Sequence, residues 1–249
     1  MRILVVNPNT TAAMTRKIGA AARAAASPGV EIVAVNPDSG PPSIEGYYDE
    51  VFSIPGVIEE MRKAGEVDAT VIACFDDTGL DAARCVSKAP VVGIGEAGYF
   101  MASLIADRFG VVTTLPRSIA PIEKNLTKYG LAGRCARVRA CQVAVLDLED
   151  ARSNARRLIL DEARKALAED GAEAIVLGCA GMTELARDLA EEIGAPVLDG
   201  VACAVALVEA AARIGLRTSK LNTYAAPLPK AYAGLLRNFS PDGRVAGPR

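Results

Sequence analysis

Residues 69–80, ATVIACFDDTGL, and residues 174–185, AIVLGCAGMTEL, share one pattern: a short apolar run, a small residue, a cysteine and a small or polar turn. An apolar run of this length, bounded by turn residues, is typical of a strand that is buried on both faces of a parallel sheet. Ligands of such sheets bind at the carboxyl ends of the strands. Cys74 and Cys179 come at those ends, so the pattern places both thiols where chemistry is expected.

Three landmarks recur in the same order at nearly one spacing. Residues 5–11, VVNPNTT, resemble residues 112–118, VTTLPRS, at an offset of 107, and the two cysteines are 105 residues apart. The tripeptide Ala-Pro-Val at residues 89–91 recurs 106 residues later, at 195–197. We therefore predict two copies of one α/β unit that face each other across a cleft, with one cysteine on each wall.

Composition excludes several classes of function. The 249 residues are 51% hydrophobic and 23% charged, which is typical of a soluble globular protein. A net charge of −2 predicts no nucleic-acid or membrane partner, and no apolar run is long enough to span a membrane. The chain enters a strand by Ile3 without a basic leader, so we expect a cytoplasmic protein with reduced cysteines.

The sequence contains no histidine. This excludes Ser-His-Asp and Cys-His catalysis, and proton transfer must use Cys, Asp, Glu, Lys, Tyr or water. No cysteine spacing is typical of a metal site, and no cofactor motif is present, so we expect neither a metal nor a cofactor.

The apolar pattern and the turn residues predict the remaining elements. We expect strands at 2–6, 31–35, 90–94, 109–114, 136–145 and 196–198, and helices at 11–26, 50–65, 97–108, 116–129, 147–169 and 200–214. A helix is also expected after each cysteine, the second reaching Ile193. Residues 217–249 are expected to form an irregular arm that frays from about Asn238. Residues 1–94 with 200–249 are predicted to form the first lobe and the arm, and residues 95–199 the second lobe.

Two polar turns are candidates for holding a substrate oxygen. The turn NPNTT has Thr10 or Thr11 as the expected helix cap, and Asn9 adds a side-chain amide. In the second copy, Thr114 places a hydroxyl at the position of Asn7. The alternative is that these residues serve only as turn and cap.

Two further segments border the predicted cleft. Residues 37–46, PDSGPPSIEG, are either a lid that brings Ile44 to the substrate or a plain connector. Asp76 and Asp77 follow Cys74, and we favour a capping role at Asp77 or Thr78 over a catalytic role, because a carboxylate raises the pKa of a nearby thiol.

Cys85, Cys135, Cys141 and Cys203 are expected to be core residues. Cys74 and Cys179 differ, because they occupy equivalent places and each precedes an expected helix whose dipole would lower the pKa of the thiol. Two opposed thiols suit the inversion of a carbon that is acidified by a carbonyl group. One thiolate removes the proton from one face, and the other thiol returns a proton to the opposite face.

The motifs NPNTT, PSIEG, IACF, VVTTLP and LGCAGM, in this order, resemble those of hydantoin and allantoin racemases in the aspartate/glutamate/hydantoin racemase superfamily. The resemblance covers the chain to about Lys220. It implies two flavodoxin-like lobes, an active site between them with one cysteine from each lobe, no cofactor, and assembly into homo-oligomers. Together with the two polar turns and the possible lid at residues 37–46, the resemblance gives these expected substrate contacts: Asn9, Ile44, Phe75, Thr114, Leu115, Pro116, Ala180 and Gly181.

The turns after the cysteines distinguish branches of this superfamily. Glutamate and aspartate racemases resemble Cys-Asn-Thr and Cys-Thr-His at these places, whereas this chain has Cys-Phe-Asp at 74–76 and Cys-Ala-Gly-Met at 179–182. The less polar turns favour a 5-substituted hydantoin, including allantoin, over a free amino acid. Asp76 and Thr78 replace the glycine and proline of the commoner Cys-Phe-Gly-Asp-Pro-Gly pattern.

Other functions remain open at this point. Arylmalonate decarboxylases keep only the second cysteine, and maleate isomerases use one cysteine as a nucleophile. An amino-acid racemase and a non-catalytic protein that binds a small metabolite are further alternatives. The presence of both cysteines favours racemisation, because inversion is the only one of these reactions that needs two acid/base groups.

Overall fold

The computed structural model describes residues 1–150 and 152–242, and it contains two four-stranded parallel sheets. The first sheet has the order β2-β1-β3-β4, and β1 lies in the middle, with Leu4 opposite Val33 on one side and Thr70 on the other. Its strands are β1 (Arg2–Val6), β2 (Glu31–Val35), β3 (Ala69–Ile72) and β4 (Val91–Gly93).

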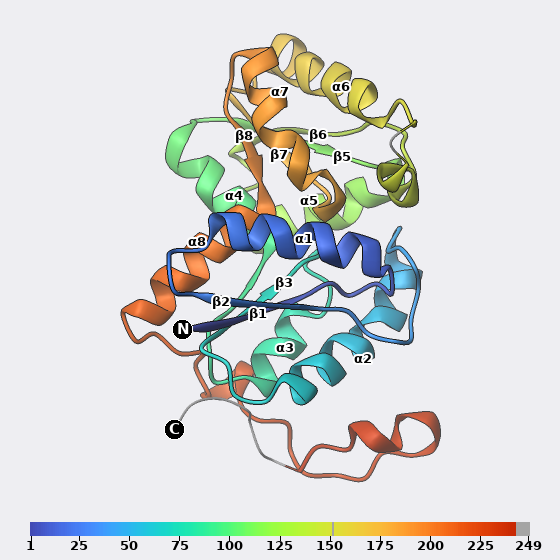
Figure 1. Cartoon of the computed structure of the whole chain (residues 1–249), viewed down its shortest axis with the longest axis vertical. Coiled ribbons are helices and arrows are strands. Elements are labelled where there is room, and N and C mark those ends of the chain that lie inside the picture. Colours follow the sequence, from blue (N-terminus) through green and yellow to red (C-terminus); the bar gives the residue numbers. More distant parts are fainter. Residues whose placement is uncertain (151, 243–249) are drawn as a thin grey trace.

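The second sheet repeats this topology with the order β6-β5-β7-β8. The strands that precede the two cysteines, β3 and β7, occupy the same place in the two sheets. The order is that of flavodoxin-like folds. The predicted pair of α/β lobes is therefore confirmed (Figure 1). The strands are β5 (Phe109–Thr113), β6 (Cys135–Ala140), β7 (Ala174–Gly178) and β8 (Val197–Asp199).

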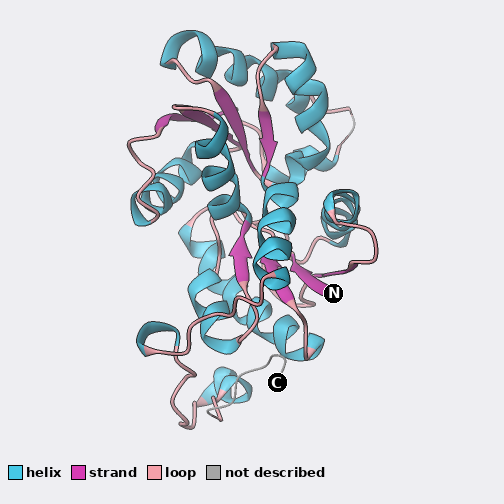
Figure 2. Cartoon of the chain, turned by 90° about the vertical axis from the view of Figure 1, so that its left-hand side faces the viewer, coloured by secondary structure: helices cyan, strands magenta, loops and turns pink. Residues whose placement is uncertain are grey.

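Helices cover both faces of each sheet (Figure 2). They are α1 (Ala12–Ala25), α2 (Tyr47–Ala64), α3 (Leu80–Val86), α4 (Ile94–Ile105), α5 (Ile119–Lys128), α6 (Ala155–Asp170), α7 (Ala186–Ile193) and α8 (Gly200–Arg213). Short 3₁₀ helices are η1 (Pro116–Ser118), η2 (Val145–Glu149), η3 (Ala180–Leu185), η4 (Asn222–Tyr224) and η5 (Gly234–Phe239).

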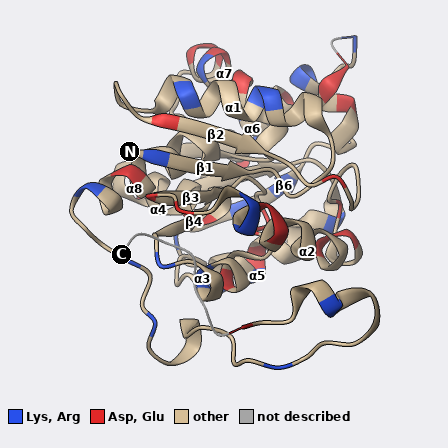
Figure 3. Cartoon of the chain, turned by 60° about the horizontal axis from the view of Figure 1, so that its bottom comes forward, with Lys and Arg blue, Asp and Glu red and all other residues tan. Residues whose placement is uncertain are grey.

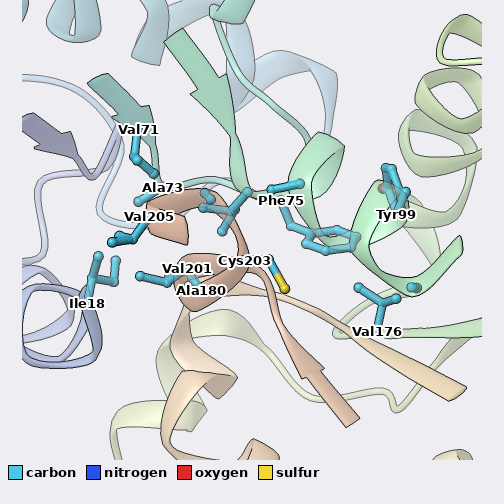
Figure 4. Close-up of a cluster of buried hydrophobic side chains, with 14 of the residues drawn as sticks. Ile18, Val71, Ala73, Phe75, Tyr99, Val176, Ala180, Val201, Cys203 and Val205 are labelled. Carbon is cyan, nitrogen blue, oxygen red and sulfur yellow. The ribbon is translucent and has the colours of Figure 1, made fainter. Parts of the chain in front are cut away.

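One apolar core joins the two lobes. Buried side chains of the first sheet, such as Val71, and of the second sheet, such as Val176, belong to the same cluster, together with Val201 and Val205 of α8 (Figure 4). Helices α4 and α8 approach closely here, because a Cβ added at Gly200 would lie only 2.6 Å from the carbonyl oxygen of Ile94. Glycine permits this approach, and the two lobes are packed together rather than merely tethered.

Each sheet also has an outer core of its own. Leu4, Val6 and Ile72 pack with Val57 and Met61 of α2 on the outer side of the first sheet. The second sheet packs its outer face against α6 and α7, through side chains that include Val112, Ile159, Leu177 and Leu189. The sheets are thus buried on both faces, as their continuous apolar strands predict.

Several element predictions need correction. The strand expected at 136–145 is Cys135–Ala140, and the helix expected at 97–108 is Ile94–Ile105. The helix after Cys74 begins only at Leu80, behind Gly79 in the left-handed conformation. The helix expected from Asp147 begins at Ala155, because Asp150 accepts a hydrogen bond from the Arg152 N–H and closes a turn there. Helix α2 begins at Tyr47, earlier than expected, and continues through Pro55.

Residues 217–242 form the predicted irregular arm, which is attached to the first lobe. Thr218 donates its backbone N–H to the carbonyl of Lys88 and its hydroxyl to the carbonyl of Ala89. Fraying was expected from about Asn238, yet the carbonyls of Asn238 and Phe239 accept hydrogen bonds from Arg62. The part of this expectation beyond residue 242 lies outside the described residues. The division of the chain into residues 1–94 with 200–249 and residues 95–199 stays a prediction.

Charged residues of both signs are interspersed along the chain (Figure 3). Within residues 1–150 and 152–242, no helix is long and apolar enough to cross a membrane.

Candidate active site

A cavity with about 410 Å³ of empty space, part of it open to solvent, is lined by both Cys74 and Cys179. Its lining comes from both lobes: Asn7, Asn9, Met14, Ile44, Ala73, Cys74, Phe75, Asp76, Thr114, Ser118, Val145, Gly178, Cys179 and Ala180. The carboxyl ends of the central strands meet here, which is where ligands bind in sheets of this topology.

The strands β3 and β7 bring the two thiols to this cavity. Ala73 continues the pairing of β3 with β1 by donating its N–H to the carbonyl of Val6, and Cys74 follows it. Cys179 directly follows β7. Gly178 is needed between strand and thiol, since a Cβ there would lie 2.9 Å from Thr113 Cα. Both cysteines are half-buried.

Burial dominates the chemistry of the thiols. It raises the pKa of Cys74 well above the ordinary value, and the carboxylate of Asp76 adds to the rise, while a hydrogen bond from Thr78 Oγ1 to the sulfur, 3.3 Å long, opposes it. Burial raises the pKa of Cys179 to about 12, against a backbone hydrogen bond from Gly181. These raised pKa values favour the protonated form of both thiols at neutral pH.

The expected lowering of the thiol pKa by helix dipoles is wrong, because burial raises both pKa values. Helix α3 begins only at Leu80, six residues after Cys74, and the segment after Cys179 is the short 3₁₀ helix η3. Individual N–H and O–H donors lower the pKa values of the thiols instead, but this effect is smaller than the rise caused by desolvation.

The turn after β1 is a network of side-chain amides. Asn9 Oδ1 accepts hydrogen bonds from Asn7 Nδ2 and from the Thr11 N–H, both at 2.9 Å. Asn7 Nδ2 also donates to Thr15 Oγ1 at 3.0 Å. Asn9 therefore satisfies the N-terminus of α1 in place of the Thr10 and Thr11 side chains, and its amide orientation is fixed. Asn9 Nδ2 donates one of its two hydrogens to Met14 Sδ at 3.3 Å, and Asn9 lies in the cavity lining.

The second lobe contributes Thr114 and Ser118 to the opposite part of the lining. Thr114 is buried, and its carbonyl accepts the N–H of Val143. Ser118 donates its N–H to the carbonyl of Leu115 and forms the end of η1. In the internal repeat, Thr114 corresponds to Asn7, and both residues line the cavity. Ser118 corresponds to Thr11, which does not line it.

The loop at residues 37–46 reaches from the first lobe to the second. Ile44 is only 8% exposed and lines the cavity. Glu45 Oε1 accepts a hydrogen bond from the Val145 N–H at 2.9 Å, and Val145 lines the cavity too. The side chains of Thr10 and Thr11 donate to the carbonyls of Pro41 and Pro42 and hold the base of the loop. These contacts favour the lid over the plain connector.

The two aspartates after Cys74 point in different directions. Asp77 accepts hydrogen bonds from the Gly95 and Glu96 N–H groups at 3.0 and 2.9 Å, and from Tyr129 Oη at 2.7 Å. Asp77 therefore caps α4, whereas the expectation was a cap on the helix that follows Cys74. Asp76 stays at the cavity, and it also lines a neighbouring cavity with about 800 Å³ of empty space.

Most of the expected contacts come together in the cavity lining: Cys74, Cys179, Asn9, Ile44, Phe75, Thr114 and Ala180. Leu115, Pro116 and Gly181 do not line it. Pro116 is exposed, whereas Leu115 and Gly181 are half-buried. The other lining residues were not among the expected contacts: Asn7, Met14, Ala73, Asp76, Ser118, Val145 and Gly178. The internal repeat was a signal for Asn7, the counterpart of Thr114, and no local signal identifies Met14, Ser118 or Val145.

The remaining cysteines, Cys85, Cys135, Cys141 and Cys203, are absent from the lining. Among residues 1–150 and 152–242, no cluster of three Cys, Asp or Glu side chains could hold a metal ion.

Comparisons with known proteins agree with this geometry. The family model of the Asp/Glu/Hydantoin racemases matches residues 3–208. The hydantoin racemase of Pseudomonas sp. (strain NS671) is 50% identical over 241 residues, which cover 96% of this chain and 97% of that protein. The hydantoin racemase of Rhizobium meliloti is 50% identical over 236 residues, covering 94% and 98%. The structure of an allantoin racemase from Klebsiella pneumoniae superposes with a TM-score of 0.93 at 47% identity, covering 97% and 99%.

Proposed function

The chain belongs to the Asp/Glu/hydantoin racemase family, and on this premise we propose that it inverts the C5 stereocentre of 5-substituted hydantoins, including allantoin. It is an isomerase of the racemase type. The observation that carries the proposal is the convergence of Cys74 and Cys179, from equivalent strands of two repeated sheets, on one cavity.

The proposed chemistry is a proton transfer through a planar intermediate. The thiolate of one cysteine removes the hydrogen from C5, and the electron pair of the C–H bond moves into the adjacent carbonyl to form an enolate. The thiol of the other cysteine then donates its proton to the opposite face of C5. One sulfur has gained a proton and the other has lost one, so the roles are exchanged for the reverse direction.

The enolate oxygen needs preorganised donors. Asn9 Nδ2 is supplied by the first lobe, and its direction is fixed because Asn9 Oδ1 accepts the Thr11 N–H. The Thr114 hydroxyl is supplied by the second lobe. Donors of this kind, held in a cavity of low polarity, stabilise a developing oxyanion more than the neutral carbonyl.

The lining supports a neutral ring as substrate. Of the residues that the structure places in it, none is lysine or arginine, so no cation is available to pair with the carboxylate of a free amino acid. Ile44, Phe75 and Val145 provide apolar contact, and the asparagines and Thr114 provide hydrogen bonds. This combination suits a hydantoin, which carries amide groups but no carboxylate.

Polarimetry tests the proposal. Wild-type protein should bring each pure enantiomer of a 5-substituted hydantoin to zero rotation faster than buffer alone, whereas Cys74→Ser and Cys179→Ser should not. Cys85→Ser is the matched control, because Cys85 is absent from the cavity lining. If the wild-type protein leaves the rotation at the buffer rate, the proposed function is wrong.

We also propose that the chain self-associates. Helix α2 exposes Tyr47, Tyr48, Val51 and Phe52, each more than half accessible to solvent. An exposed apolar face of this kind marks an interaction site. Sedimentation velocity should give more than the mass of one chain, and Phe52→Glu should shift the distribution toward single chains. A single-chain mass at every concentration would contradict self-association.

A further inference from the structure

Asp76 is the only charged residue in the cavity lining that the structure describes. Its backbone is engaged, because Asn125 Nδ2 donates to its carbonyl oxygen at 2.9 Å. Its carboxylate oxygens have no hydrogen-bond or ion-pair partner among the described residues, in contrast to the adjacent Asp77, whose carboxylate accepts three hydrogen bonds.

The surroundings make this lack of a partner costly. The side chain is largely enclosed, and burial together with the like charge of Glu50 raises the pKa of Asp76 to about 7. Asp76 is half-buried, so its carboxylate loses part of its hydration and gains no hydrogen bond from the protein in return. An unpartnered carboxylate that faces a ligand cavity in this way is available to donors on the ligand.

We propose that Asp76 accepts hydrogen bonds from N–H groups on the C5 substituent, and so selects ureido-bearing hydantoins over alkyl-bearing ones. This inference rests on the proposed function. A ureido group presents two parallel N–H bonds, which match the two oxygens of a carboxylate as a fork. An alkyl group of the same shape would leave the carboxylate unsatisfied, and sites built to hydrogen-bond a group discriminate strongly against analogues that lack it.

The position of Asp76 favours the substituent over the ring as its partner. In the proposed mechanism C5 lies between the thiols, and the carbonyl next to it faces Asn9. Asp76 stands where the cysteine cavity borders the second cavity, so this wall offers space to atoms that extend beyond the ring. Ile44 and Val145 also line the cavity, where the loop at residues 37–46 meets the second lobe. Their apolar side chains cannot accept hydrogen bonds from N–H groups of a substituent.

The test compares two substrates of matched shape. Allantoin carries a ureido group, and 5-isobutylhydantoin carries an alkyl group with the same number and branching of non-hydrogen atoms. We would measure kcat/KM for the pure enantiomers of both, corrected for spontaneous racemisation, in wild type, Asp76→Asn and Asp161→Asn. Asp161 is the control, because it is absent from the lining of both cavities and its carboxylate already pairs with Arg157 at 3.6 Å.

The readout is the ratio of kcat/KM for allantoin to that for 5-isobutylhydantoin. A loss of stability or a change in thiol ionisation lowers or raises both values together and leaves the ratio unchanged. Wild type should prefer allantoin by at least about tenfold, and Asp76→Asn should reduce the ratio by about 10- to 100-fold, the range expected for hydrogen bonds to a charged group. Asp161→Asn should keep the wild-type ratio.

The two proposals fail differently. If wild type racemises both substrates with a ratio near one, or if Asp76→Asn keeps the wild-type ratio, the role of Asp76 in selectivity is wrong and racemisation stands. A loss that is equal for both substrates would assign Asp76 to the ring or to the thiols. If wild type racemises neither substrate, the proposed function and this inference fall together. A wild-type ratio near one overturns the inference even if Asp76→Asn does not fold.

Discussion

Glu45 and Val145 lie 100 residues apart in the sequence, yet Glu45 Oε1 accepts a hydrogen bond from the Val145 backbone N–H at 2.9 Å. This contact joins the loop of one lobe to the start of η2 in the other, beside the cavity that holds both thiols. It is accompanied by an ion pair between Lys17 and Glu149, whose charged atoms are 3.2 Å apart. The loop is thus fastened at the cavity by a single carboxylate.

Removal of that carboxylate should weaken substrate binding more than it affects the fold. In Glu45→Ala the loop loses its contact with the second lobe, and we expect KM to rise by about tenfold, the effect of one hydrogen bond to a charged group. Glu59→Ala, a change on an exposed face of α2, is the control. Steady-state kinetics with a hydantoin checks this, and an unchanged KM in Glu45→Ala would show that the loop is a plain connector.

The two cysteines should be separable by isotope exchange. Cys74→Ser and Cys179→Ser each keep one thiol, which faces one side of C5. Each variant should therefore exchange the C5 hydrogen of one enantiomer with deuterium from the solvent without inverting it, and the two variants should select opposite enantiomers. NMR of each pure enantiomer in deuterated water, corrected for spontaneous exchange, gives the answer. Exchange of the same enantiomer by both variants would exclude a mechanism with opposed thiols.

The oxygen cradle should contribute to turnover. Asn9→Ala removes the fixed amide donor, and Thr114→Val removes the hydroxyl with little change in volume. Each should lower kcat by about 10²- to 10³-fold, as the loss of one oxyanion donor does in other enzymes. Because Asn9 also caps α1, its stability must be measured by thermal unfolding at the same time. Wild-type turnover in either folded variant would place that residue outside the reaction.

The pH dependence follows from the raised thiol pKa values. The reaction needs one thiolate, and the pKa of Cys179 is about 12, so the thiolate fraction is small and increases with pH. We expect kcat/KM of wild type to rise from about pH 6 to about pH 8, with a shallower slope near pH 7, where Asp76 ionises and raises the pKa of both thiols. The Asp76→Asn profile should rise over the same range with one slope. A plateau below pH 8 in Asp76→Asn would mean that the thiols ionise more easily than their burial indicates.

Asp77 should matter for stability rather than for selectivity. Its carboxylate satisfies two N–H groups at the start of α4 and the hydroxyl of Tyr129. Asp77→Ala leaves these donors without a partner, and the free energy of unfolding should fall by about 2–4 kcal/mol. Asp81→Ala, which breaks an ion pair with Lys128 at the surface, should cost at most about 1 kcal/mol. Urea titration followed by circular dichroism compares the two, and equal losses would contradict the role of Asp77.

The sequence predicts those features that depend on local pattern. The strands before Cys74 and Cys179 are recognisable because a strand buried on both faces has a continuous apolar run. The equivalence of the two thiols follows from the repeat. The partner of Asp77 is not predictable in this way, because the left-handed turn at Asp77 and Gly79 directs the carboxylate to α4, which is a different element. The contact between Glu45 and Val145 also cannot be predicted from the sequence. Its donor is a backbone N–H, which almost any residue at position 145 would supply.

The apolar cluster that contains Val71 of one sheet and Val176 of the other has a mechanical consequence. Lobes that share a core cannot swing apart without exposing apolar side chains to water, so we expect the separation of the two sulfurs to stay nearly constant through a reaction cycle. Ile44 does not belong to this shared cluster, and we expect a substrate to enter by displacement of the loop that carries it.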